Sequence, residues 1–365
     1  MRYDTALLAV ACFGMYDAAG NYYSVTAGYR GGSRGRSGLA WFDAPNPTPD
    51  YYANMPGHNA EPNMVEGLTD AWLNGGTAVS QYDWEEMYTA NLLSDDGAAL
   101  YVADRHMEAP DNFQLAFNVA GADRDGFGFD YGVRLRSDNS NFYREVYDLL
   151  GAEYAVNRDP FTGADSNVRD AGRLVGEGER YDYDYHILQH SVSAYCAGHY
   201  RHGRLGVSFG AEVAGLWLLR EGHYEKETLP GKASYGPSKT CAFTPYNVFL
   251  ACRYGFTARH RISLELYAGE YAPDYEDVFL SPDYSNAVFA GSRTVTVWGA
   301  GLDYRLPLSP FAEFQLSGYA MPQSAGTRLS HYYDDLYGQY CDLVVFGLLA
   351  VAWGVAAGRG SPLPN

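Results

Sequence analysis

The sequence predicts an all-β fold, part of an antiparallel transmembrane β-barrel with roughly eleven strands in its 365 residues. Three observations predict it. Segments about ten residues long, which is enough for a tilted strand to cross a bilayer, alternate bulky apolar with small or polar side chains. Short and long connections alternate between these segments. Aromatic residues make up 15% of the chain and include 33 tyrosines, as the aromatic girdles of such barrels require.

The alternation is clearest in residues 113–136, FQLAFNVAGADRDGFGFDYGVRLR. Large apolar side chains occupy the odd positions on both sides of a turn at 121–125, from Phe113 to Val119 and from Phe127 to Leu135. Small, polar or charged residues occupy the even positions. Because side chains alternate across a strand, each of these two strands has an apolar and a polar face. A soluble sandwich and an outer-membrane barrel both produce this pattern.

The same alternation, in places weaker, predicts the remaining strands in chain order. They are 4–14 and 21–30 before this pair, then 184–199, 205–214, 248–256, 262–269, 293–305, 311–321 and 340–352. The first of these segments is expected to be a strand rather than a signal peptide, because Asp4 weakens a basic start and the apolar run is short.

The connections favour the barrel over the sandwich. Short turns are expected at 17–20, 121–125, 201–204, 257–260 and 307–310, and long segments at 31–111, 137–182, 221–244, 272–292 and 322–339. Outer-membrane barrels have short periplasmic turns and long extracellular loops. We therefore expect all the long loops at one end of the barrel.

Composition excludes several other classes of protein. A net charge of −18 argues against nucleic-acid binding, which needs a basic surface. The mean hydropathy is −0.30, and no run of about 18 apolar residues predicts a transmembrane helix. The five cysteines contain no CxxC pair, so neither a disulfide framework nor a zinc site is indicated.

No catalytic residue, metal site or cofactor is predicted. The sequence contains no nucleophile elbow, phosphate-binding loop or dinucleotide fingerprint, so the chain is not expected to be an enzyme, with a small outer-membrane hydrolase as the alternative. His186 and His190 share a strand face but lie roughly 13 Å apart, while His199 and His202 point to opposite faces. The acidic loop 159–170 lacks the order of an EF-hand and is expected to be a solvated polar loop.

Several loop sequences resemble TonB-dependent outer-membrane receptors of the Bacteroidetes type, in the order found in that family. They include GLAWFDAPNPTPDYYANMPG at 38–57, YTANLLSDDGAALYVADRH at 88–106, YREVYDLLGAEYAVNRDPF at 143–161 and further stretches at 175–187 and 219–248. The resemblance covers most of the chain. It implies a receptor in the cell outer membrane of a Gram-negative bacterium, which takes up scarce nutrients through a plugged barrel of about twenty-two strands with energy passed on by TonB.

The sequence departs from that family in three respects. No plug domain precedes the barrel, no segment that contacts TonB is visible, and the strands number about half of the family's barrel. Residues 1–365 are therefore expected to be the N-terminal half of a receptor barrel, without the plug. Open strand edges are costly in lipid, so this chain alone is not expected to be a competent transporter.

The first long loop supplies the candidate ligand-binding residues, namely Trp41, Asp50, Tyr51 and Tyr52. The run PNPTP at 45–49 fixes φ at three positions and stiffens the loop that presents them. Aromatic faces suit a sugar or a chelate, and acidic groups suit a cation. Packing against neighbouring loops is the other interpretation of these side chains.

Nutrient uptake by an outer-membrane receptor, with the ligand bound by extracellular loops, is the predicted function. The expected partners are outer-membrane lipid, the TonB system, a surface lipoprotein and a small nutrient of unknown identity, and nucleic acid is not among them. One alternative is a self-contained barrel of about twelve strands that acts as an adhesin or structural surface protein. Another is a soluble β-sandwich binding module.

Overall fold

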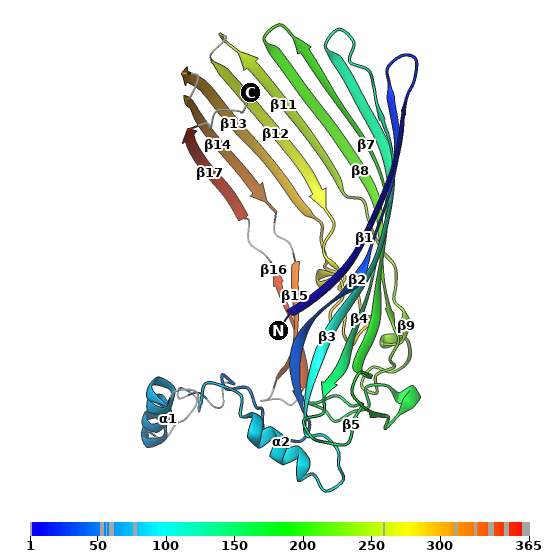
Figure 1. Cartoon of the computed structure of the whole chain (residues 1–365), viewed down its shortest axis with the longest axis vertical. Helices are drawn as coiled ribbons and strands as arrows, with labels where there is room; N and C mark the ends of the chain where they lie inside the picture. Colours follow the sequence, from blue (N-terminus) through cyan, green and yellow to red (C-terminus); the bar gives the residue numbers. More distant parts are fainter. Residues whose placement is uncertain are drawn as a thin grey trace.

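The computed structural model describes residues 2–51, 55, 57, 62–75, 79–257, 260–309, 312–324, 327–334, 339–346 and 350–359. They form one large, curved antiparallel sheet (Figure 1). Its strands follow one another in chain order, each hydrogen-bonded to the next. The predicted all-β, antiparallel fold is therefore confirmed, and the sheet is open between its first and last strands.

Eleven strands lie along this path, the number that the alternation predicted. They are β1 (Arg2–Tyr16), β2 (Tyr22–Trp41), β3 (Tyr101–Ala120), β4 (Phe127–Asp148), β7 (Arg180–His202), β8 (Leu205–Gly222), β11 (Tyr246–Gly255), β12 (Arg261–Tyr271), β13 (Val295–Ser309), β14 (Ala312–Gln323) and β17 (Ala350–Arg359). A separate hairpin of β15 (Thr327–Asp334) and β16 (Gln339–Phe346) lies between β14 and β17 in the chain. The predicted strand 340–352 was wrong, because residues 340–346 belong to this separate hairpin and the eleventh strand is 350–359.

All the long connections emerge at one end of the sheet, as predicted, and the short turns lie at the other (Figure 1). The short turns have local causes. In the first turn, the Asp17 carboxylate accepts hydrogen bonds from the backbone N–H groups of Ala19 and Asn21. In the second, Gly126 has φ +80°, and a Cβ there would stand 2.0 Å from the carbonyl oxygen of Arg201.

The predicted loop boundaries were wrong, because several strands run further than their apolar alternation. β2 continues to Trp41 and β3 begins at Tyr101, so the first long loop is 42–100. β4 and β7 likewise shorten the second long loop to 149–179, and β15 occupies part of 322–339. Beyond the lipid both faces of a strand meet water or loops, so backbone pairing continues while the apolar-polar alternation ends.

The long loops contain secondary structure that the sequence analysis did not predict. The first loop holds α1 (Pro62–Asn74) and α2 (Trp84–Leu92). The Asn91 side chain fixes α2 to the strand ends, donating to the carbonyls of Tyr101 and Leu149 and accepting from the Leu100 and Tyr101 N–H groups. Among the described residues, no helix is both long and apolar enough to span a membrane.

Short strands and 3₁₀ turns brace the other long loops. They are β5 (Ala155–Val156), β6 (Leu174–Val175), β9 (Gly236–Pro237), β10 (Cys241–Phe243), η3 (Val168–Asp170), η4 (Gly231–Ala233) and η5 (Tyr275–Asp277). β9 and β10 fold back to pair with β8.

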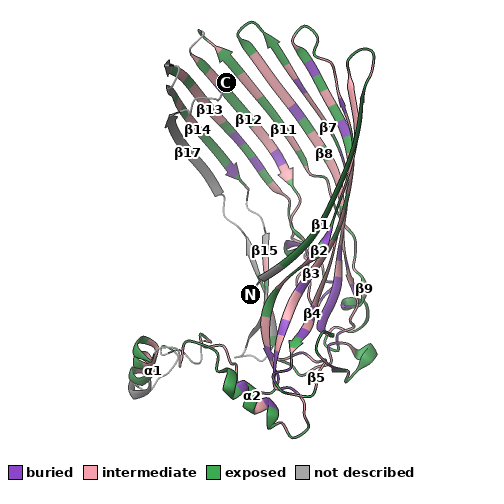
Figure 2. Ribbon diagram, in the orientation of Figure 1, coloured by how far each residue is buried: buried purple, intermediate pink, exposed green. Residues whose placement is uncertain are grey.

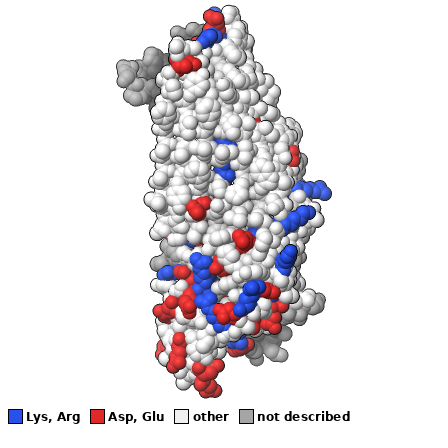
Figure 3. All heavy atoms as spheres, turned by 90° about the vertical axis from the view of Figure 1, so that its right-hand side faces the viewer, with Lys and Arg blue, Asp and Glu red and all other residues white. Residues whose placement is uncertain are grey.

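The halves of the strands next to the short turns carry an outward apolar face. On β4, every odd residue from Phe127 to Leu135 is exposed, while Gly128 and Gly132 are buried on the other face and Arg134 pairs there with Glu212 at 3.5 Å. The face shown in Figure 3 has few charges over this part of the molecule and many near the long loops. We identify this part of the strands as the membrane-spanning segment, with the apolar face toward lipid.

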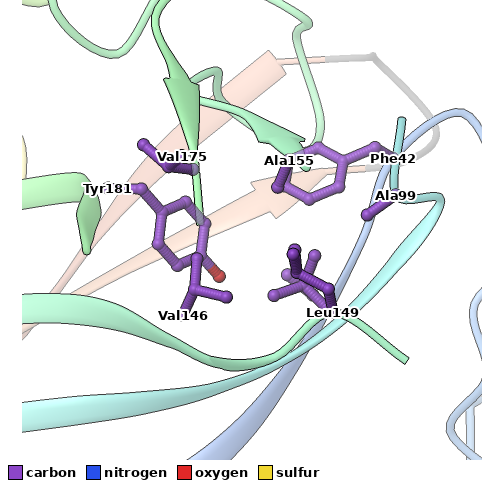
Figure 4. Packing of buried hydrophobic residues seen from close by; sticks show 9 residues of the cluster. Phe42, Ala99, Val146, Leu149, Ala155, Val175 and Tyr181 are labelled. Atoms are coloured by element: carbon purple, nitrogen blue, oxygen red, sulfur yellow. The ribbon is translucent and has the colours of Figure 1, made fainter. Parts of the chain in front are cut away.

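The buried core lies at the long-loop end, where purple positions gather in Figure 2. Loop residue Phe42 packs with Val146 and Tyr181 from the ends of β4 and β7, with Leu149 just beyond β4, and with Ala155 of β5 (Figure 4). A second cluster joins Tyr185 and Leu218 to Val278 and Phe279 of the loop after β12. The loops are therefore packed onto the strand ends and form a defined platform outside the membrane.

Candidate ligand-binding cavity

A cavity of about 1460 Å³ lies at this platform, on the face of the sheet opposite the lipid-facing side chains. Its walls come from segments far apart in the chain. β2 and β3 provide Arg34 and Glu108, β7 provides Tyr183 and Tyr185, and the loop after β12 provides residues 280–284. The strand extensions beyond the membrane thus form one wall and the packed loops form another.

Aromatic rings dominate one side of the cavity. Phe142 and Tyr185 are direct neighbours across β4 and β7, and their rings stack with centroids 5.1 Å apart and an interplanar angle of 11°. Tyr275 packs against Phe142 at 5.3 Å, and Tyr183 packs against Tyr185 at 5.9 Å. Cross-strand pairing holds the Phe142 and Tyr185 rings in place, and Tyr183 and Tyr275 pack against them from the bulge and from η5, so the aromatic wall exists without a ligand.

Charged groups border the aromatic wall. The Arg34 guanidinium makes a bidentate pair with the Glu108 carboxylate, with N–O distances of 2.7 and 2.8 Å. Asp283 accepts a hydrogen bond of 2.9 Å from the Tyr185 hydroxyl. Burial raises the pKa of the Asp283 carboxyl despite this hydrogen bond. The cavity therefore offers the guanidinium of Arg34, which is paired with Glu108, and the carboxyl of Asp283, whose ionised form is disfavoured by burial.

His106 is a neutral imidazole in the cavity wall. Its Nδ1 lies 2.9 Å from the Tyr183 hydroxyl, and its Nε2 lies 3.6 Å from Oδ1 of Asp104. Burial and the neighbouring Arg144 lower the pKa of His106 to about 4. The buried Asp104 Oδ1 has no hydrogen-bond partner among the described residues, which favours the tautomer with the proton on Nε2, facing this oxygen.

Behind His106 lies a buried network of ion pairs. Asp104 and Asp182 are both 0% exposed in their side chains, and Arg144 bridges them, donating from Nε to Asp104 at 2.6 Å and from Nη1 to Asp182 at 2.8 Å. Lys226 Nζ lies 3.3 Å from the Asp182 carboxylate, and Tyr181 donates to Asp104 at 2.5 Å. Two carboxylates and two cations give a formal charge of zero, which makes burial tolerable.

A β-bulge positions this network. Tyr143 pairs with Asp184 but Arg144 pairs with Tyr181, so β7 carries two extra residues at this point. Asp182 adopts φ +61°, and its N–H donates to Asn157 at 2.8 Å. Bulges re-aim side chains near functional sites, and this one turns the Asp182 carboxylate toward Arg144.

The structure brings two of the four predicted ligand-binding residues to the cavity. Trp41 and Tyr51 line it, and Trp41 also contacts Phe161 edge to face at 5.8 Å. Asp50 is exposed and does not line the cavity. Tyr52 lies outside the described residues.

Sequence reasoning missed the strand residues of the cavity. His106 lies in a segment that was expected to be a loop, and Tyr185 lies at the start of a predicted strand whose cavity role was not recognised. The run YDYDY at 181–185, which includes Tyr183, is the sequence feature that could have indicated them. In the acidic loop 159–170, which was expected to be solvated, Asp159 is buried and caps its own turn by accepting from the Phe161 and Thr162 N–H groups.

Comparison with known proteins finds similarity in structure but not in sequence. No protein-family model matches the chain, and no curated protein matches it. A solved structure titled "Copper transporter OprC" is similar with a TM-score of 0.59 and 10% identity, over 99% of this chain and 44% of that one. This chain therefore spans less than half of the length of that transporter.

Two further solved structures match with lower scores. They are a Pseudomonas aeruginosa FadL homologue (TM-score 0.39, 10% identity, 98% of this chain and 67% of that one) and OmpT of Vibrio cholerae, expressed in the outer membrane (TM-score 0.23, 10% identity, 98% and 96%). The likeness to the copper transporter agrees with the antiparallel sheet and its apolar outer face. The chain thus has the fold of an outer-membrane β-barrel, as predicted, and that fold places it in the outer membrane of a Gram-negative bacterium.

Proposed function

We propose that residues 1–365 form the barrel domain, or part of it, of an outer-membrane receptor that imports a small nutrient and binds it in the cavity at the long-loop end. The observation that carries this proposal is the cavity of about 1460 Å³, which lies outside the membrane-spanning segment and opens on the inner face of the sheet. Ligand sites are concave, mostly preformed and rich in aromatic groups with a few polar ones.

Transport driven by the TonB system is the second part of the proposal. Its support is the resemblance of the loop sequences to TonB-dependent receptors. A transporter with the same fold, at 10% identity, is consistent with it. The platform of α2 and the packed loops faces away from the membrane (Figure 1) and is the expected contact for a surface lipoprotein.

The lining favours a ligand with a flat or sugar-like ring and a polar edge. The stacked pair Phe142–Tyr185 and the rings of Trp41 and Tyr51 offer apolar faces. Hydroxyls and the Arg34–Glu108 pair lie near them and can bond to ligand oxygens. Oligosaccharides and planar metal chelates both have this chemistry, and a binding screen distinguishes them.

Trp41 and Trp217 provide a matched test. Trp41 lines the cavity, whereas Trp217 is 44% exposed on the lipid-facing side of β8. The chain would be purified from outer membranes in detergent and titrated calorimetrically with a panel of oligosaccharides and ferric or cupric chelates. We expect Trp41→Ala to weaken binding of the ligand found by at least tenfold and Trp217→Ala to leave it unchanged.

Two results would overturn the proposal. Equal binding by the two variants would show that the ligand does not bind in the cavity. Unchanged uptake of the same compound by cells with an in-frame deletion of the gene would show that the protein is not its importer, and would favour the adhesin or structural role.

A further inference from the structure

We propose that the outer face of β7 and β8 carries a binding site for a divalent transition-metal ion, formed by His186, Glu221 and His223. One ligand atom from each of the three side chains can be chosen so that all lie within 4.8 Å of one another. Among the described residues, no other group of three His, Cys, Asp or Glu side chains meets this criterion. All three side chains are partly exposed, so an ion can reach them.

The strand register explains the cluster. His186 of β7 is the direct antiparallel neighbour of Glu221 of β8, and such pairs have Cβ atoms about 4.5–5.5 Å apart. His223 follows Glu221 by two residues, and its N–H donates to the Asp184 carbonyl at 2.9 Å, which continues the pairing. The three ligands therefore lie on one face of two adjacent strands. His186 and His190 were too far apart to chelate one ion, and the neighbouring strand supplies the partners instead.

Asp184 orients one of the ligands. Nδ1 of His223 lies 3.0 Å from Asp184 Oδ1, where the ring N–H donates to the carboxylate. This hydrogen bond leaves Nε2 of His223 unprotonated and available to a metal. A carboxylate behind a ligating histidine is the usual outer-shell partner in metal sites. Asp184 is in turn held by Arg180, whose Nη1 donates to Oδ2 at 2.8 Å, so Asp184 is a positioning residue.

The charges around the cluster favour a cation. Asp184 and Glu221 contribute two negative charges and Arg180 one positive charge, so the sum with neutral histidines is −1. The His186 and His223 rings meet edge to face, with centroids 4.6 Å apart and an interplanar angle of 79°.

The donor set indicates the class of ion. Two imidazoles and one carboxylate suit zinc, copper(II) or nickel rather than calcium or magnesium. Metal–ligand bonds of about 2.1 Å place the ligand atoms of a tetrahedral site roughly 3.4 Å apart. The three ligand atoms lie within 4.8 Å of one another, so the side chains must move slightly closer together to bind the ion. Three protein ligands leave one position for water or an exogenous ligand.

This site is separate from the proposed ligand cavity. Glu221 and His223 lie on the face of β8 opposite Leu218, which packs in the buried cluster, and opposite Arg220. They lie four to six residues beyond Trp217 of the lipid-facing side, so Glu221 is roughly 13 Å further along the strand. The ion would therefore join β7 to β8 on the outer surface, above the membrane.

Zinc titration tests the site. The chain, purified from outer membranes in detergent, competes for Zn²⁺ with a chromophoric chelator, and we expect one Zn²⁺ per chain. His223→Ala and Glu221→Gln should each weaken binding at least tenfold, and Asp184→Asn should weaken it about 10–100-fold. His190→Ala is the matched control, because His190 lies exposed on the same face of β7 but four residues away, and it should bind like the parent.

The controls separate a lost ligand from a lost fold. A heat-dependent shift in electrophoretic mobility, retained by each variant, shows that the fold is intact. Equal weakening in His190→Ala and His223→Ala, or no binding of Zn²⁺, Cu²⁺ or Ni²⁺ by the folded parent, would overturn the proposal. Binding of the cavity ligand should be unchanged in His223→Ala, so failure of this site and failure of the proposed function are distinguishable.

Discussion

Replacing Arg144 by methionine should strongly destabilise the folded chain. Arg144 bridges Asp104 and Asp182, and both carboxylate side chains are 0% exposed. The network holds two negative and two positive formal charges, so Arg144→Met leaves a net charge of −1 without water around it. Breaking a buried ion pair from one side costs about 3–5 kcal/mol, which is a large part of the stability of most domains.

The control is Arg34→Met. Arg34 makes an equally short bidentate pair with Glu108, but its side chain is 54% exposed. An exposed pair contributes about 0–1 kcal/mol, so this variant should unfold almost like the parent. The difference between the two variants isolates the effect of burial, because the same change of side chain is made in both.

The assay is unfolding by urea at pH 7.5 in detergent, followed by tryptophan fluorescence. A second variant, Arg144→Met with Asp104→Asn, returns the network to zero charge, with Asp182 and Lys226 remaining, and should recover part of the lost stability. If Arg144→Met costs no more than Arg34→Met, or if the double variant is no more stable than the single one, the reasoning about a neutral buried network is wrong.

Three further predictions concern other parts of the chain. The pKa of His106 falls from 6.5 to about 4 on folding. Its contribution to the free energy of unfolding, roughly 3 kcal/mol, is therefore present above pH 6.5 and lost as the pH falls toward 4. His106→Gln should flatten this part of the plot of stability against pH, and an unchanged plot would contradict the burial argument. Val133→Lys on the lipid-facing side should cost about 2–4 kcal/mol in the same assay, whereas Gln114→Lys on the inner face should cost far less, and equal costs would contradict the assignment of faces. Asn91→Leu should cost about 1–3 kcal/mol of local stability and expose the loop 42–100 to protease, and unchanged cleavage would show that α2 is held otherwise.

The membrane-spanning part of the fold could be predicted from the sequence, because lipid on one side imposes a strict period of two. The Phe113 and Phe127 rows are exposed on one face, and the short turns at 17–21 and 121–126 lie within one residue of the expected bounds. Beyond the lipid that constraint ends. The strand ends at Trp41, Tyr101 and Asp148 therefore carried no period and were assigned to loops.

The candidate sites could be predicted only in part, because they depend on neighbours across strands. Trp41 and Tyr51 stand out by type and both line the cavity, although Trp41 ends β2 and only Tyr51 lies in the proline-stiffened loop. Tyr183 faces His106 from a bulged strand, and no spacing in the sequence shows a bulge of two residues. The same holds for His186, whose partners come from another strand in a register fixed only by folding.

The length of β4 gives the protein a mechanical connection between its two ends. The strand places Phe142 in the cavity wall and Phe127 beside a short turn. It is paired with β7 throughout that span and with β3 from Asp130 onward. Fifteen steps of about 3.3 Å separate these two phenylalanines, roughly 50 Å in all. If a bound ligand tilts the cavity wall, β4 would transmit the tilt as a rigid movement to the end of the sheet that carries the short turns. A loop of the same length would absorb the movement instead.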